Sequence, residues 1–112
     1  MENLQELQAI GVIESSGLEP ETVAMLKSKF IPFLEQAREW KSRAEGLVVT
    51  DAGQTREMKM AREARLALRE IRVNADKTRK ALKADALAYG NAVQAVFNTI
   101  KLAIEPIEKH LL

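Results

Sequence analysis

The sequence predicts an all-α fold, an elongated helical hairpin or bundle with one long coiled-coil-like helix, completed by association with a second copy. Apolar residues recur at steps of three and four along most of the 112 residues, which is the spacing of one face of an α-helix. The β-branched run Val48-Val49-Thr50 is too short for more than an extended connector. Because about half of the chain enters one helix, too little sequence remains to cover that helix, and we expect a homo-oligomer, most simply a dimer.

Residues 1–17 predict a short, weak N-terminal helix followed by a turn. Apolar positions at helical spacing within residues 2–10 are Leu4, Leu7 and Ile10, and Gly11 then interrupts the pattern. A turn is indicated between Ser15 and Pro20 by serine, glycine and proline. We therefore separate this segment from a helical hairpin or bundle over residues 18–112.

A second helix is predicted over about residues 20–45, because proline suits the first turn of a helix. Its apolar positions are Val23, Leu26, Phe30, Phe33, Leu34, Ala37 and Trp40. Pro32 lies inside this pattern, and a proline in a helix interior removes one backbone hydrogen bond and clashes with the preceding turn. The sequence therefore predicts a kink near residues 29–31, or a division into two helices.

Residues 46–52 form the predicted connector to the long helix. Thr50 or Asp51 is a suitable N-cap for that helix, and Gln54 follows Asp51 at the spacing of a capping box. The long helix is expected to begin near residue 53 and to continue to about residue 105, with a C-terminal turn beyond it.

Two heptad-like apolar seams define this long helix. The first seam contains Ala61, Ala64, Leu68, Ile71, Ala75, Thr78 and Leu82, and the second contains Ala86, Tyr89, Val93, Val96, Ile100, Ala103 and Ile107. They join through two successive steps of four, which is a stutter that leaves the helix continuous. Across both helices, the predicted packing interface consists of Phe30, Phe33, Trp40, Leu68, Ile71, Leu82, Tyr89, Val93, Val96 and Ile100.

Two residues disturb the long helix. Gly90 is unfavourable in a helix interior, so it predicts a bend or a close crossing with another helix. Pro106 should kink or restart the last turns. Because the chain ends in the apolar pair Leu111-Leu112 without a capping glycine, we expect it to be part of a longer protein.

Charge is distributed unevenly along the chain, although the net charge is only +1. Residues 56–83 contain ten basic and four acidic side chains. Six of the basic residues keep helical spacing beside the first seam, namely Arg62, Arg65, Arg69, Arg72, Arg79 and Lys83. They could follow a phosphate backbone. The alternative is that they form ion pairs with acids of a neighbouring helix such as Glu35, Glu39 and Glu45, and no interleaved aromatic residue indicates base stacking.

Other classes of function have little support in the residues. The absence of cysteine excludes disulfides, thiolate nucleophiles and zinc knuckles. The single histidine, His110, lies near Glu105 and Glu108, where a solvated surface is the ordinary interpretation. We therefore predict no enzyme, no cofactor, no metal and no small-molecule substrate. The N-terminus lacks a signal peptide and no stretch is apolar enough for a membrane span, so the predicted location is the cytoplasm.

Five segments resemble a family of uncharacterised bacteriophage and prophage proteins, and the resemblance extends over almost the whole chain from about Leu18 onward. They are Phe30–Trp40, Leu47–Asp51, Glu57–Leu68, Leu87–Gly90 and Ile104–Glu108. The resemblance implies a gene among early phage functions, near recombination and replication, and no assigned activity. Many members of the family also continue beyond the point where this chain stops.

Two functional hypotheses follow. The first is a non-catalytic phage accessory protein whose basic helix face contacts DNA or a DNA-bound recombination protein. The second is a protein-interaction module that binds or inhibits a host protein, for example one of a defence system. A purely structural coiled coil is a third interpretation.

Overall fold

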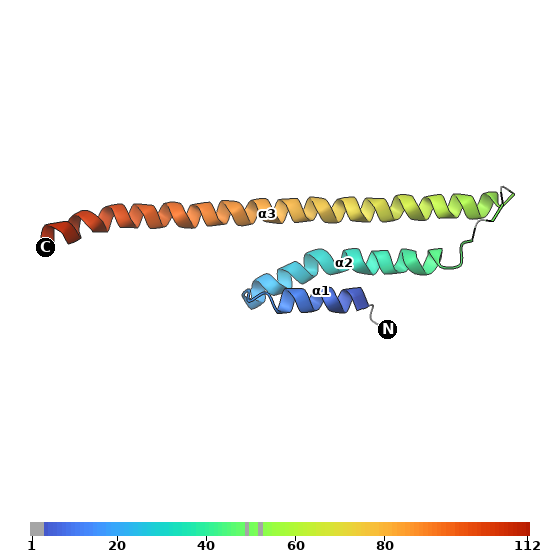
Figure 1. The fold of residues 1–112 in the computed structure, drawn as a ribbon, viewed down its shortest axis with the longest axis horizontal. Coiled ribbons are helices and arrows are strands. Elements are labelled where there is room, and N and C mark those ends of the chain that lie inside the picture. The colour runs from blue at the N-terminus through green and yellow to red at the C-terminus, as the bar shows by residue number, and fades with distance from the viewer. Residues whose placement is uncertain (1–3, 49, 52) are drawn as a thin grey trace. The chain divides into compact units, whose positions relative to one another are not determined.

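A computed structural model describes residues 4–48, 50–51 and 53–112, and within them it contains three helices and no strand (Figure 1). The helices are α1 (Leu4–Glu14), α2 (Pro20–Ala44) and α3 (Thr55–Leu111). The predicted all-α class with a long C-terminal helix is therefore confirmed. The chain divides into two units, Met1–Lys77 and Thr78–Leu112, so α1 packs within the first unit and is not set apart as residues 1–17.

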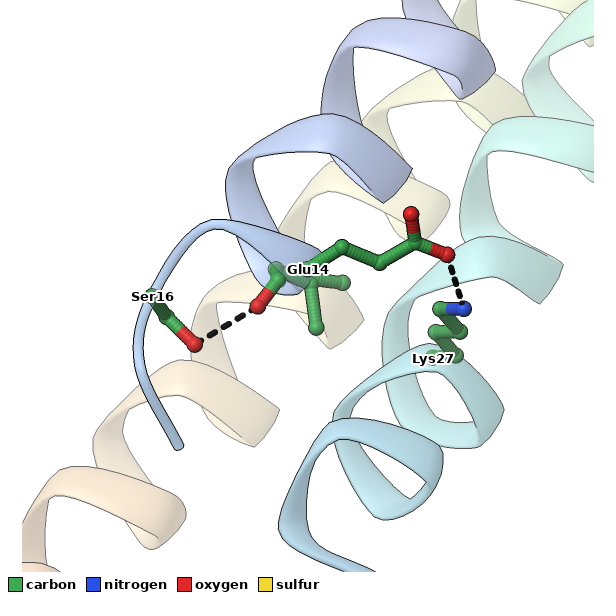
Figure 2. A network of polar contacts seen from close by, with 4 residues as sticks. Glu14, Ser16 and Lys27 are labelled. Carbon is green, nitrogen blue, oxygen red and sulfur yellow. Dashed lines mark hydrogen bonds and ion pairs between the residues drawn. The ribbon is translucent and has the colours of Figure 1, made fainter. Parts of the chain in front are cut away.

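The turn between α1 and α2 is closed by serine and glycine, as the sequence indicated. Ser16 Oγ donates a hydrogen bond of 2.6 Å to the carbonyl oxygen of Ile13, and Lys27 Nζ lies 2.6 Å from Glu14 Oε1 (Figure 2). Gly17 has a φ of 78°, a left-handed conformation that costs little only for glycine. These contacts turn the chain back so that α1 packs on α2.

Helix α1 continues through Gly11, where the sequence predicted an interruption, and two of its apolar residues are exposed. Leu4 is 68% and Leu7 48% exposed, whereas Glu6 and Ile13 are buried at 6% and 9%. The Glu6 carboxylate lies 3.2 Å from Arg38 Nη1 of α2. The helical spacing of Leu4 and Leu7 thus indicated the helix, but the ion pair with α2 leaves these two side chains toward solvent.

Helix α2 is one helix that contains Pro32. Figure 1 shows its axis changing direction part-way along, in the pale blue region. Pro32 therefore kinks α2 and does not divide it into two helices. Its predicted apolar face is half-buried throughout, at Val23, Leu26, Phe30, Phe33, Leu34, Ala37 and Trp40.

The start of α3 is organised by Gln54. Its Oε1 accepts hydrogen bonds from the backbone N–H groups of Thr50 (2.6 Å) and Asp51 (3.1 Å), and its Nε2 donates to the carbonyl of Val48 (3.0 Å). This is the side chain of the predicted capping box, but the helix begins at Thr55 and not near residue 53. Val49 and Ala52 of the predicted connector, and residues 1–3 of the predicted N-terminal helix, lie outside the described residues.

Within the first unit, α2 and the first turns of α3 run antiparallel. Trp40, Arg43 and Leu47 line one groove with Met60, Glu63 and Ala64, and Phe33 and Leu34 line another with Ala75. Ala64, which is 5% exposed, is the best-buried residue of this contact. Among the residues that the structure describes, Glu6, Ile13 and Ala64 alone are buried, so the core is very small.

The second unit consists of residues 78–112 and is helical to Leu111. The helix continues through Gly90 and through Pro106, so the expected end near residue 105 and the restart of the last turns were wrong. A proline whose preceding turns are already formed loses one hydrogen bond but does not have to end a helix. Nearly all side chains of this unit are exposed, and Leu82 is half-buried.

Candidate functional site

Four arginines of the first unit form a continuous exposed surface on α3. We call Arg62, Arg65, Arg69 and Arg72 the arginine stripe, and each of them is exposed. At 3.6 residues per turn, the centre of the stripe lies on the opposite side of α3 from the centre of the face that lines the contact with α2. Packing of the hairpin therefore leaves the stripe open to solvent.

Acidic side chains of α2 do not neutralise the arginine stripe. Glu39 lies 3.2 Å from Arg43 one turn along its own helix, and Glu35 and Glu45 are exposed. Within the described part of the chain, no ion pair joins the stripe to any acid. Four guanidinium groups on one helix face thus keep their donors available.

The structure assigns the other two predicted contact residues to the second unit. Arg79 and Lys83 follow the stripe in sequence and are both exposed. The first unit therefore brings together four of the six basic residues that the sequence selected.

Most of the predicted packing residues of the first unit are partly covered. Phe30, Phe33, Trp40 and Ile71 are half-buried, and the Arg43 guanidinium lies 4.8 Å from the centre of the Trp40 ring. Leu68 is more exposed, at 36%, because Ala67 and Ile71 are the residues that line the groove with α2. Phe33 and Trp40 line the two grooves between α2 and α3.

The predicted packing residues of the second unit are exposed. Tyr89 is 74%, Val93 52%, Val96 60% and Ile100 49% exposed. Three further large side chains share this face, namely Phe97, Ile104 and Ile107, the last of which belongs to the predicted second seam, and they are 56%, 47% and 60% exposed. We call these seven residues the apolar stripe. Their spacing of three, four and seven could have identified them.

Along most of the apolar stripe, the other faces of α3 also carry uncharged residues. No acidic or basic residue occurs between Asp85 and Lys101. An exposed helix face of this length without charge is uncommon on a soluble monomer.

An apolar groove of about 390 Å³ lies where the three helices of the first unit meet. It is lined by Ala9, Val12, Ile13, Phe30, Phe33, Leu34 and Ala75. Because no polar side chain lines it, nothing in it would orient a substrate.

Groups for metal or acid–base chemistry are not gathered in the described residues. Among them, no three His, Cys, Asp or Glu side chains are placed to hold a metal ion. His110 is exposed near the end of α3. In the part of the chain that was searched, no helix has both the length and the apolar character needed to cross a membrane.

Comparisons of the chain with protein-family models, with curated proteins and with solved structures gave no match.

Proposed function

We propose that this protein is a non-catalytic DNA-binding accessory protein of a bacteriophage or prophage, and that its arginine stripe contacts DNA phosphates. One observation carries the proposal. Arg62, Arg65, Arg69 and Arg72 are exposed on one face of α3 and have no acidic partner among the described residues.

The chemistry of the arginine stripe fits phosphate better than other anions. A guanidinium group donates two parallel hydrogen bonds to a phosphate and stays charged at any physiological pH. The stripe extends over about 15 Å at 1.5 Å per residue, so its four charges can follow successive phosphates. Since no aromatic side chain lies within the stripe, binding would depend on the backbone and not on base sequence.

The phage origin and the role near recombination or replication rest on the family resemblance of the sequence segments described above. An early phage accessory role is compatible with a small protein that binds DNA without catalysing a reaction. The cytoplasm of the host bacterium would then be its location.

The experiment is a fluorescence-anisotropy titration with single- and double-stranded oligonucleotides at two salt concentrations. If about four phosphates are contacted, affinity should fall on the order of 100-fold between about 50 and 200 mM salt. The triple variant Arg65→Glu, Arg69→Glu, Arg72→Glu should abolish binding.

A matched control separates the stripe from net charge. The triple variant Arg56→Glu, Lys59→Glu, Lys77→Glu changes the charge equally on other faces of the same helix, and it should keep most of the affinity. Equal losses of DNA affinity in both triple variants would show that only the net charge matters. If the unmodified protein does not bind DNA at low salt, the proposal is wrong.

A second candidate is a protein-interaction module, which the exposed apolar stripe favours. It predicts a complex that is insensitive to salt and to reversal of the arginines, and that is lost on substitution of Ile100 by glutamate. Binding of a host or phage protein with these properties, together with no DNA binding, would favour this alternative.

A further inference from the structure

The apolar stripe of the second unit is large enough to form an interface by itself. Seven side chains from Tyr89 to Ile107, together with Leu111 at 77% exposure, each expose about half or more of their surface. At on the order of 100 Å² for each large apolar side chain, they offer roughly 800 Å², which is the area that each partner buries in an interface of standard size. Something of comparable length must cover it.

Gly90 lies on the flank of the apolar stripe, where a missing side chain leaves room for a partner. It lies within α3, its φ is not positive, and a Cβ added to it would meet nothing within 4 Å. Neither backbone conformation nor packing within the chain therefore requires glycine here. Glycine in a helix face is expected where another helix approaches closely.

We propose that the apolar stripe is covered by the same segment of a second copy of this chain, running antiparallel. From Leu82, the last residue of the first seam, through the second seam to Ile107, the steps of four and three residues are the same in both directions, so this segment can pair with a reversed copy of itself. In this register Tyr89 packs opposite the second copy's Ile100, and Val93 packs opposite the second copy's Val96.

The same register explains Gly90. On the flank of the seam, Gly90 lies opposite the second copy's Phe97, and by the two-fold symmetry Phe97 lies opposite the second copy's Gly90. The missing side chain at one position makes room for the ring at the other. Because of the two-fold symmetry, the contact between Gly90 and Phe97 occurs twice in the dimer. Both flanks of the interface can then reach the close packing typical of protein interiors.

Charge favours the antiparallel direction over the parallel one. Residues 56–83 contain ten basic and four acidic side chains, and a parallel pair would place two such segments side by side. The antiparallel pair separates them and brings Lys83 near the second copy's Glu108. Both of these side chains are exposed in the single chain.

The register also confines the pairing to the second unit. When Leu82 lies opposite Ile107, Thr78 lies opposite Leu111, so the paired segment begins where the second unit begins. The face of α3 in the first unit, from Ala61 to Ala75, already faces α2. Self-association and the arginine stripe therefore use different parts of the chain, and neither proposal depends on the other.

Disulfide cross-linking of the full chain tests direction and register, because the protein contains no cysteine. An equimolar mixture of Leu82→Cys and Ile107→Cys should give a cross-linked heterodimer under mild oxidation. Each variant alone should give little, since its two sulfurs would be about 37 Å apart along the helix axis at 1.5 Å per residue and a disulfide needs Cα atoms within about 7 Å. Efficient cross-linking of Leu82→Cys with itself would overturn the antiparallel pairing.

Light scattering and one matched pair of substitutions test whether a second copy of the chain covers the apolar stripe. The unmodified chain should have the mass of a dimer or of an assembly of several dimers. Gly90→Leu should weaken association by more than tenfold because the second copy's Phe97 loses its space, whereas Ala95→Leu on the opposite face should not. A monomer at every concentration, or equal effects of both substitutions, would overturn the proposal, and DNA titration of the same samples reports separately on the arginine stripe.

Discussion

At the scale of single residues, the most unusual group is the buried carboxylate of Glu6. Its side chain is 8% exposed and faces the Arg38 guanidinium, yet its Oε1 has no hydrogen bond of good geometry. An ionised carboxylate is rarely buried without a compensating charge. Arg38 therefore fixes the position of α1 on α2.

Removal of this charge partner should destabilise the first unit. We expect Arg38→Met to lower the free energy of unfolding by about 1–3 kcal/mol, because it leaves a buried carboxylate without compensation. Urea unfolding followed by far-UV circular dichroism at one fixed chain concentration measures this.

The double variant Glu6→Leu, Arg38→Met should recover much of that loss, because no buried charge remains. Lys41→Met, at an exposed site on the same helix, is the control and should change stability by less than about 0.5 kcal/mol. Equal effects of Arg38→Met and Lys41→Met would contradict a role for the Glu6 contact.

At the scale of secondary-structure elements, two glycines six positions apart in the sequence have opposite roles. Gly11 lies inside α1 in an ordinary helical conformation, and a Cβ there would meet nothing within 4 Å. Gly17 ends the turn after α1 with a φ of 78°. The sequence alone suggested an interruption at Gly11 and could not distinguish these two cases.

Alanine substitution should therefore act with opposite sign at the two sites. Gly11→Ala should raise the free energy of unfolding by about 0.5–1 kcal/mol, because alanine has the higher helix propensity and fewer unfolded conformations. Gly17→Ala should lower it by roughly 1 kcal/mol, since a left-handed conformation is unfavourable for alanine. Thermal unfolding of both variants at one concentration is the measurement, and a shared sign would contradict the assignment.

The start of α3 depends on the Gln54 amide. Gln54→Ala removes hydrogen bonds to three backbone groups, so we expect a loss of about 1 kcal/mol and fraying of the first turn of α3. Gln94→Ala is a suitable control, because Gln94 bonds only to the exposed Asn98 side chain in the described structure. Chemical shifts of Thr55 to Met58 report fraying directly, and unchanged shifts would exclude it.

At the scale of the whole molecule, stability should depend on concentration. Unit 1 holds the three buried residues of the described chain, and unit 2 holds none. Residues 86–104 should therefore gain amide protection in hydrogen exchange when the chain concentration is raised about 100-fold, because association stabilises the paired helix by mass action. Protection in α1 and α2 should change much less. Exchange at 86–104 that stays fast at every concentration would contradict self-association.

The sequence by itself determined the helices and most of their apolar faces, because helical hydrogen bonds and side-chain spacing are local properties of the chain. The face of α2 and the basic positions of α3 were predicted at the residues where they occur. The resemblance to a phage family and the binding function stay predictions.

Tertiary structure decided which faces are covered. The burial of Glu6 in place of Leu4 depends on Arg38 of another helix, and no spacing within α1 contains that information. The two seams of α3 look alike in sequence, yet Ala64, Ile71 and Ala75 of the first seam line grooves with α2, whereas the residues of the second seam from Ala86 onward are exposed in the other unit. The physical reason is length, since the 25 residues of α2 cannot cover the 57 residues of α3, and only the path of the connector determines which part is left exposed.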